Sequence, residues 1–328
     1  MLNQDAYLSG DVFADTIKQA ATRDGFGTGV VEAGKADPRI VVLCADLKES
    51  TRAEEFEKVF PERFIEMGVA EQNMATVGSG MAAAGKIPFI ASYAAFNPGR
   101  NYEQIRTTIA LNQVAVKICG MHAGVSVGPD GATHQMLEDI ALMRALPHMT
   151  VIAPIDAEEA RKAVIAAAQT NGPVYLRFGR SATPMLTTKE TSFQIGKALK
   201  LWTSDAPKLA ILSTGSLGYT ALLAARALAE KGVESIVLHV PTIKPLDEAA
   251  VLDAAKHAGR VLTVEEHQAA GGFGSAVAEF LSEHHPVPIK RLGVQDQFGQ
   301  SGSPEELLAH YGLDAFHIEE AAHVLISA

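Results

Sequence analysis

The sequence contains very little cysteine, and this scarcity limits the chemistry open to the protein. Its two cysteines, Cys44 and Cys119, each lie inside an apolar run that is typical of a buried strand. We therefore expect two reduced, buried thiols rather than a disulfide or a metal-binding pair. No apolar stretch approaches the roughly 20 residues that a membrane-spanning helix needs, and residues 1–10 lack the apolar core of a secretion signal. The sequence thus predicts a cytoplasmic protein with no membrane partner.

Basic residues are also scarce relative to acidic ones. The chain has 28 lysines and arginines against 38 aspartates and glutamates, which gives a formal net charge of -10. Such an excess of negative charge argues against general binding to nucleic acid. A complete dinucleotide-binding loop is missing as well, because neither Gly25–Gly29 nor Gly271–Gly274 has the required spacing between a strand and a helix. We expect both glycine sets to form turns or points of close packing.

What the sequence does contain is a regular alternation of apolar strand-like runs and helical patterns. The first unit has expected strands at 40–45, 87–91, 114–119, 149–153 and 174–177, and expected helices at 70–84, 102–111, 135–146 and 157–170. The second has expected strands at 209–213, 235–240, 260–264 and 289–292, expected helices at 220–231, 246–257 and 274–283, and two short helices after Ser303. This alternation predicts an α/β protein with two domains, each a mainly parallel sheet flanked by helices. We place the first domain at 1–185, a polar linker at 186–192 and the second domain at 193–328.

The stretch from Gly68 to Met74 places one carboxylate, Glu71, at the start of a helix made almost entirely of small or apolar residues. A glutamate at this position has little contact with water. Two interpretations are open. Glu71 could simply complement the positive end of the helix or cap a backbone N–H, or it could be a functional acid that works with residues of the 128–135 segment.

Polar and aromatic side chains follow several expected strands, at the edge where ligands collect in parallel sheets. These residues are Asp46, Ser50, Tyr93, Phe96, His122, Asp130, Arg177 and Arg180. Arginine and histidine together suit a phosphorylated, hydroxyl-rich substrate, because the planar guanidinium group matches phosphate geometry. The alternative for any single residue of this set is an ordinary solvated position in a loop.

Four motifs carry a resemblance to a known family. They are Ala45–Ser50, Gly68–Met74, Gly128–Gln135 and Gly172–Arg177. In this order and spacing the chain resembles the transketolase family over essentially its whole length, as a pyrimidine-binding domain followed by a C-terminal domain. The resemblance implies thiamine diphosphate as cofactor and transfer of a two-carbon ketol unit between sugar phosphates, with the substrates of the pentose phosphate pathway as the default.

One departure from the family is informative. Full-length transketolases hold the metal and the diphosphate with a Gly-Asp-Gly motif followed by Asn-Asn, and neither motif occurs here. The chain therefore resembles the C-terminal subunit of a split, two-chain transketolase, and we expect no metal site of its own. The resemblance implies a partner, the N-terminal subunit, which holds a Mg or Ca ion and the diphosphate. It also implies self-association into a dimer and a complex of two copies of each chain.

The resemblance further implies roles at the cofactor. Glu71 matches the glutamate that hydrogen-bonds a ring nitrogen of the aminopyrimidine, which makes it a catalytic residue. Tyr93 and Phe96 match two aromatic residues that pack on this ring, although plain core packing is the alternative for both. The third aromatic position of the family is Gly99 here, a gap that Tyr102 could fill.

A second group matches family residues that bind the sugar phosphate: Arg23, Ser50, His122, Asp130 and Arg177. Asp130 is expected to hold a donor hydroxyl, and the others to hold the phosphate or a hydroxyl beside it. His134 matches a second histidine that lines the substrate channel and is expected to take part in catalysis. Asp46 matches an acid near the cofactor at the interface between subunits, with a strand-end cap as the alternative.

Three other functions fit parts of this pattern. The β subunit of a 2-oxoacid dehydrogenase has the same two domains and also needs a separate partner. A half of a deoxyxylulose-phosphate synthase would share the run from Asp130 to Gln135, but that enzyme is normally a single chain. A non-catalytic protein derived from such a half is the third. The run from Asp130 to Gln135 and the missing diphosphate motif together favour the split transketolase.

Overall fold

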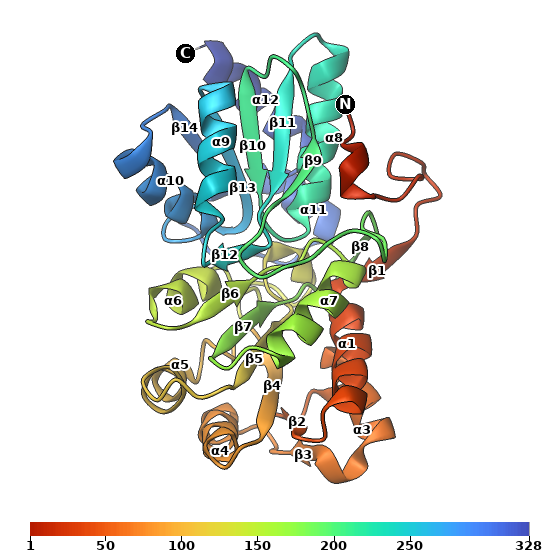
Figure 1. Ribbon diagram of the computed structural model, residues 1–328, viewed down its shortest axis with the longest axis vertical. Helices are drawn as coiled ribbons and strands as arrows, with labels where there is room; N and C mark the ends of the chain where they lie inside the picture. The colour runs from red at the N-terminus through yellow and green to blue at the C-terminus, as the bar shows by residue number, and fades with distance from the viewer. Residues whose placement is uncertain (328) are drawn as a thin grey trace.

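The computed structural model describes residues 1–327, and two sheets follow one another along its long axis (Figure 1). The strands of the first sheet are β2 (Ile40–Cys44), β3 (Phe64–Glu66), β4 (Ile87–Tyr93), β5 (Lys117–Met121), β6 (Thr150–Ile152), β7 (Val174–Arg177) and β12 (Thr242–Lys244). Those of the second sheet are β9 (Leu199–Trp202), β10 (Leu209–Ser213), β11 (Ser235–His239), β13 (Val261–Gln268) and β14 (Ile289–Val294). A small antiparallel pair joins β1 (Gln19–Ala21) to β8 (Ala182–Pro184).

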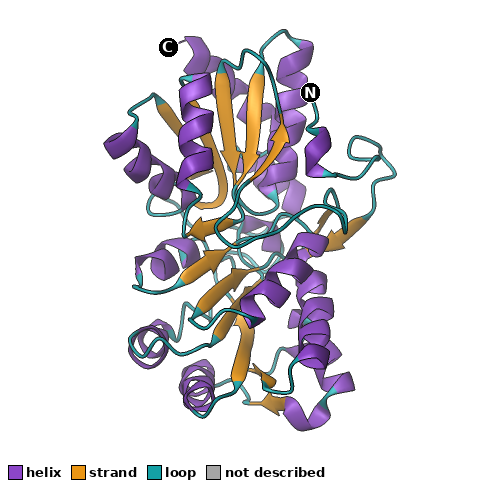
Figure 2. Cartoon of the chain, viewed as in Figure 1, coloured by secondary structure: helices purple, strands orange, loops and turns teal. Residues whose placement is uncertain are grey.

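Helices alternate with these strands and cover both faces of each sheet (Figure 2). In the first domain they are α1 (Thr22–Ala36), α2 (Lys48–Thr51), α3 (Glu54–Val59), α4 (Glu71–Ala83), α5 (Tyr102–Gln104), a π-helical run η3 (Ile105–Ala110), α6 (Asp139–Ala145) and α7 (Ala157–Ala168). In the second domain they are α8 (Leu217–Glu230), α9 (Glu248–Ala258), α10 (Phe273–His284), α11 (Pro304–His310) and α12 (Ala315–Ser327). Short 3₁₀ turns form η1 (Gln4–Ala6), η2 (Pro61–Arg63) and η4 (Val125–Val127).

The seven-stranded sheet has the order β12-β6-β7-β5-β4-β2-β3, and the five-stranded sheet has the order β14-β13-β10-β11-β9. All paired neighbours in both sheets run parallel except β12 with β6 and β9 with β11. The predicted fold class, two mainly parallel sheets flanked by helices, is therefore confirmed. The two antiparallel edge strands are additions that the sequence pattern did not indicate.

The apolar strands owe their uniform composition to burial on both faces. In β2, Val41 and Leu43 pack with α4 and α6 on one side of the sheet. Val42 and Cys44 point to the opposite side, where they meet α1, α3 and α7. Because successive side chains of a strand point in opposite directions, a strand covered on both faces has no polar positions to alternate with. Both Cys44 and Cys119 are buried and unpaired, as predicted.

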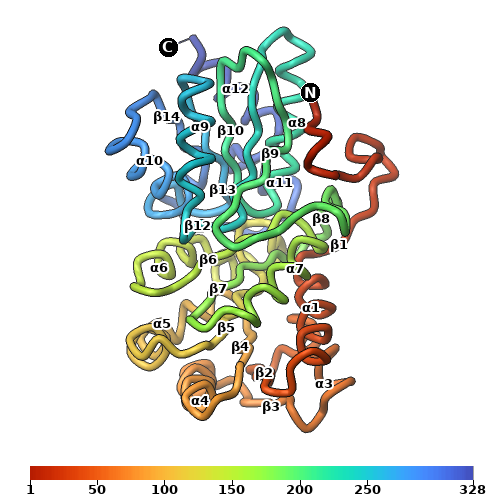
Figure 3. The backbone as a smooth tube through the Cα atoms, viewed as in Figure 1, coloured from red at the N-terminus to blue at the C-terminus, as the bar shows by residue number. Residues whose placement is uncertain are grey.

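The two domains share more structure than a simple linker implies. One hydrophobic core continues from the α4–α6 side of the first sheet to the α9–α10 side of the second. The N-terminal segment also crosses between the domains: the backbone N–H of Asn3 donates to Leu201, and Phe13 lies edge-on to Trp202 with ring centroids 6.3 Å apart. Figure 3 shows this segment beside the domain that contains the C-terminus. The segment thus packs on the second domain, although the sequence placed it in the first.

Residues 186–192, predicted as a linker, connect the two sheets but are firmly packed. Leu186 and Thr187 are buried, and the carboxylate of Asp156 accepts hydrogen bonds from both the backbone N–H and the hydroxyl of Thr187, at 2.6 and 2.7 Å. The hydroxyl of Thr191 donates to the carbonyl of Tyr7 at 2.8 Å. Two threonines of this run thus form internal hydrogen bonds, whereas Lys189, Glu190 and Ser192 are exposed. Within residues 1–327, none of the helices is both long and apolar enough to cross a membrane.

Helices α1 and α7 cover the same face of the first sheet and touch each other through glycine. A Cβ atom at Gly25 would lie 2.1 Å from the carbonyl oxygen of Ala157, which is shorter than any real contact. The glycine-rich start of α1 is thus a point of close packing, as expected. It brings the neighbouring Arg23 to the carboxyl edge of the sheet.

We predict that Gly25→Ala lowers the free energy of unfolding by about 1–3 kcal/mol, because the added methyl group forces α1 away from α7. The matched control is Gly80→Ala in α4, where no atom lies within 4 Å of the added Cβ. That change should be neutral or stabilising by up to about 1 kcal/mol, since alanine favours helix over glycine. Urea unfolding followed by Trp202 fluorescence measures both. Equal effects would contradict the close-packing role of Gly25.

Candidate functional site

Four rings gather at the carboxyl edge of the first sheet. Tyr93 ends β4, and its ring stacks on His122 with centroids 4.0 Å apart and planes at 28°. Phe96 stacks on the same tyrosine at 6.0 Å. His134 meets both aromatic rings edge-on, at 6.0 Å from Tyr93 and 5.5 Å from Phe96. Four residues predicted as site residues therefore form one cluster, which we call the ring cluster.

Two arginines place positive charge near His122 of the ring cluster. The guanidinium of Arg23, near the start of α1, donates to the carbonyl of Ser50 at 2.8 Å and lies 3.3 Å from His122 Nε2. Arg180, which follows β7, donates to the carbonyl of Val127 at 2.9 Å and pairs with Asp130 at 3.2 Å. The site thus joins cations, a histidine and a partly exposed carboxylate, a combination that suits a small anionic molecule with hydroxyl groups.

The electrostatics of His122 follow from this arrangement. The residue is 1% exposed, and burial together with the positive charges of Arg23 and Arg180 lowers the pKa of its imidazole to about 3. It is therefore neutral at physiological pH and can accept or donate a hydrogen bond without adding charge. Its backbone lies in the left-handed region at φ 55°, a conformation that is uncommon for a residue other than glycine and is concentrated at functional sites.

Glu71 begins α4 and is 2% exposed. Its carboxylate pairs with Arg100 at 2.8 Å, while its backbone carbonyl accepts a hydrogen bond from Asn101 at 3.0 Å. The guanidinium of Arg100 in turn lies 4.4 Å from the centre of the Phe96 ring. Glu71 is thus connected to the ring cluster through Arg100. The sequence suggested Tyr102 for the gap at Gly99, but Tyr102 packs into the core beside α4, and Arg100 is the residue that covers Phe96.

One predicted site residue, Arg177, makes its contacts inside the protein and not with the ring cluster. Arg177, expected at the substrate phosphate, is 8% exposed and is paired with Asp139 at 2.8 Å. Its second contact is the carbonyl of Glu266, at 2.8 Å, on β13 of the other domain. These two contacts hold the guanidinium inside the protein, so the phosphate role predicted for Arg177 does not fit. Arg180, three residues later and beyond the end of the strand, is the partly exposed arginine beside Asp130.

Asp46 also lies apart from the ring cluster. It follows β2 in the left-handed region at φ 58°, is exposed, and its backbone N–H donates to Glu66 at 2.8 Å.

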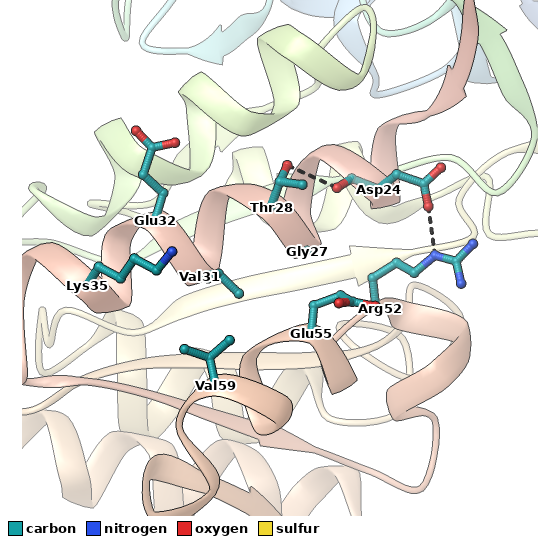
Figure 4. A pocket seen from close by; sticks show the side chains of 9 residues that line it. All are labelled: Asp24, Gly27, Thr28, Val31, Glu32, Lys35, Arg52, Glu55 and Val59. Atoms are coloured by element: carbon teal, nitrogen blue, oxygen red, sulfur yellow. Dashed lines mark hydrogen bonds and ion pairs between the residues drawn. The ribbon is translucent and has the colours of Figure 1, made fainter.

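A surface hollow of about 750 Å³ lies between α1 and α3 (Figure 4). Its wall includes the ion pair of Asp24 and Arg52, 2.7 Å long, but not the ring cluster. The ring cluster therefore lies outside this hollow.

The residues present fit one end of a thiamine cofactor. A buried carboxylate and two stacked aromatic rings suit a flat heterocycle that carries a protonatable nitrogen. Among residues 1–327, no group of three or more His, Cys, Asp and Glu side chains is arranged to hold a metal ion. The site therefore combines a carboxylate and aromatic rings that suit a heterocycle with arginines and a histidine that suit a small anionic substrate.

Comparison with known proteins agrees with this geometry. The family model of the transketolase pyrimidine-binding domain matches residues 18–185, and that of the transketolase C-terminal domain matches residues 196–318. The chain therefore belongs to the transketolase family. Several similar proteins are named as a C-terminal section or a subunit and are matched over nearly their whole length, so the chain corresponds to the C-terminal section of a split transketolase.

Three similar proteins illustrate this. A putative transketolase C-terminal section from Methanocaldococcus jannaschii is 43% identical, and the match covers 89% of this chain and 92% of that protein. A 6-deoxy-6-sulfo-D-fructose transketolase subunit, SqwH, from Clostridium sp. (strain MSTE9) is 40% identical, with 92% and 93% covered. The solved structure of a split gene transketolase, an inactive β4 tetramer, matches at 42% identity with a TM-score of 0.86, covering 94% of this chain and 98% of that one.

We predict that Arg177→Met lowers the free energy of unfolding by about 3–5 kcal/mol, because it leaves Asp139 buried without its cation. The matched control is Arg180→Met, whose ion pair is partly exposed, with side-chain exposures of 38% and 31%. That change should cost less than about 1 kcal/mol. Urea unfolding followed by Trp202 fluorescence compares the two. A stable Arg177→Met variant would contradict the structural role of Arg177 and would support a role in substrate binding.

Proposed function

We propose that this chain is the C-terminal subunit of a thiamine-diphosphate-dependent transketolase, and that it transfers a two-carbon ketol unit between sugar phosphates together with a separate N-terminal subunit. The observation that carries the proposal is the convergence of Arg23 and Arg180 on a neutral His122 that stacks on Tyr93. This arrangement offers an anion site within reach of an aromatic platform. A ketose phosphate needs both, one for its phosphate and one beside its reacting carbonyl.

The anion site is supported by the charges around it. Burial, followed by the positive charge of Arg52, lowers the pKa of Arg23, and Arg180 acts in the same direction. The positive charges of Arg23, Arg52 and Arg180 repel one another, and an anion bound among them offsets that repulsion. Ser50 lies beside Arg23, and Asp130 lies beside Arg180. In the proposed function the arginines, His122 and Ser50 bind the phosphate, while Asp130 accepts a hydrogen bond from a donor hydroxyl.

The cofactor site is supported by the burial of Glu71 and the two stacked rings of Tyr93 and Phe96. Thiamine diphosphate, when bound, supplies a carbanion that accepts the two-carbon unit. Glu71 would share a proton with a ring nitrogen of the aminopyrimidine, and the aromatic rings would orient that ring. His134, edge-on to both rings, is placed to exchange a proton or a hydrogen bond with a substrate oxygen.

The identity of the sugar is a separate question. The arginine and histidine groups match any tetrahedral oxyanion, so a sulfonate would fit as well as a phosphate. The 40% identical relative named as a 6-deoxy-6-sulfo-D-fructose transketolase subunit makes a sulfosugar a reasonable second substrate to test. We propose pentose and hexose phosphates as the first choice.

We predict that the isolated chain has no ketol-transfer activity, and that activity appears on mixing with an N-terminal subunit that carries the Gly-Asp-Gly and Asn-Asn motifs. The physical reason is that no metal or diphosphate motif is present in this sequence. The assay combines both chains, thiamine diphosphate, Mg²⁺, xylulose 5-phosphate and ribose 5-phosphate, with each chain alone as control. Size-exclusion chromatography with light scattering should give two copies of each chain. Turnover by the chain alone, or a preference for pyruvate over every ketose, would contradict the proposal.

We predict that Arg180→Met in the mixed complex lowers kcat/KM for phosphorylated ketoses about ten- to hundredfold, because a charge-assisted contact to phosphate is worth about 1.5–3 kcal/mol. The effect on hydroxypyruvate, an unphosphorylated donor, should be several-fold smaller. Lys189→Met, at an exposed position in the connection between the domains, is the control. Equal losses with both donors would show that Arg180 does not bind phosphate.

A further inference from the structure

The segment from His122 to Gln135, called the 122–135 loop below, carries three of the proposed substrate residues but has little regular structure. Its only turn of helix is η4, and Gly124, Gly128 and Gly131 all have positive φ angles, at 92°, 83° and 71°. Glycine in such conformations gives the chain little intrinsic stiffness. Contacts from outside the loop must therefore fix the positions of Asp130 and His134.

The side chain of Gln135, the last residue of the loop, connects the loop to one such contact in the second domain. It is 5% exposed, and its amide nitrogen lies within hydrogen-bonding distance of three carbonyl oxygens: Val125 at 3.0 Å, Gly128 at 3.2 Å and Gln300 at 2.9 Å. Two of these acceptors belong to the loop itself, and the third belongs to the second domain. Because the amide group has only two N–H donors, the three carbonyls share them. Gln135 thus binds both ends of η4 to a segment of the other domain.

The second domain fits closely around this side chain. A Cβ atom at Gly299 would lie 1.8 Å from Gln135 Oε1, so only glycine allows the approach. A Cβ at Gly131 would similarly lie 2.7 Å from the hydroxyl of Ser301. In both places a glycine backbone of one loop thus packs closely against a side chain of the other, and Gly131 directly follows Asp130.

A second contact between the domains supports the other side of the loop. The buried carboxylate of Glu266 on β13 accepts a hydrogen bond from the backbone N–H of Ser126 at 2.5 Å. The carbonyl of Ser126 accepts one from the hydroxyl of Ser181 at 2.7 Å. The position of η4 is thus defined by residues of both domains.

We propose that Gln135 is a positioning residue through which the second domain holds the 122–135 loop in its substrate-binding conformation. The inference rests on the proposed function and extends it, because it gives the second domain a part in substrate recognition without any contact to the substrate. Loss of the contacts of Gln135 leaves Tyr93, Phe96 and Arg23, which lie outside the loop, in place. It frees Asp130, so donors that need a hydroxyl held at Asp130 lose the most.

Two variants test this from opposite sides of the domain boundary. Gln135→Met keeps the side-chain length but removes the N–H donors, and Gly299→Ala pushes the amide out of its position. Their matched controls are Gln169→Met, at an exposed glutamine, and Gly10→Ala, where no atom lies within 4 Å of the added Cβ. In the mixed complex, both variants should raise KM for ketose phosphates about tenfold, the effect of one lost or misplaced polar contact. KM for hydroxypyruvate, which lacks the hydroxyl on the carbon next to the ketol unit, should change less than twofold.

Amide hydrogen exchange of the chain gives a readout that does not depend on turnover. Exchange within the 122–135 loop should become faster in both variants, while exchange in α8 stays at the wild-type rate. If wild-type complex transfers no ketol unit, the proposed function fails, and the exchange data still show whether Gln135 holds the loop. Unchanged exchange in the loop overturns the inference. So does an equal loss with both donors, since a merely destabilised protein would lose activity toward every substrate alike.

Discussion

The hydrogen bond from Arg177 to the carbonyl of Glu266 connects a buried ion pair of the first domain, Arg177 with Asp139, to β13 of the second domain. Asp139 accepts from Arg177 at 2.8 Å and from the hydroxyl of Tyr175 at 2.7 Å, while Arg177 also donates to the carbonyl of Glu266 in the second domain. Charges taken out of water are tolerated only while each has its partners. A sliding motion between the domains would leave this pair intact but would break the hydrogen bond from Arg177 to Glu266, so that bond favours one relative position of the domains. The 122–135 loop, which contacts both domains, depends on that relative position.

The same boundary is rich in other buried acids, and each is matched by the backbone of a neighbouring element. Glu265 accepts from the N–H groups of Phe273 and Gly274 at the start of α10, at 2.6 and 2.8 Å, while burial raises the pKa of its carboxyl to about 7. Glu266 accepts from Ser126 of the first domain. Backbone donors have fixed directions, so such contacts specify geometry more strictly than apolar packing does. This explains why a boundary with a continuous hydrophobic core also contains so many polar groups.

The sequence predicted the parts of the structure that follow from local pattern. The strand at 209–213 has the expected bounds, and Tyr93, Phe96, His122 and His134 meet because the carboxyl ends of parallel strands share one edge. The pattern could not separate Arg177 from Arg180. Both are arginines at a strand end, but Arg177 is still within β7, where both faces of the sheet are covered, and Arg180 lies beyond it. The helix α1 and the edge strand β12 were missed because their contacts, and not their own periodicity, define them.

A comparison of two ion pairs shows how the protein separates permanent contacts from exchangeable ones. At the domain boundary, Arg177 and Asp139 have side-chain exposures of 9% and 0%. At the ring cluster, Arg100 and Glu71 have exposures of 46% and 2%. Moving Arg177 would leave two dehydrated charges, whereas Arg100 can pass into water and regain its hydration. The acid is buried in both pairs, so the burial of the cation decides how easily the contact opens. Glu71 can therefore exchange its partner for another hydrogen-bonding group, and Asp139 cannot.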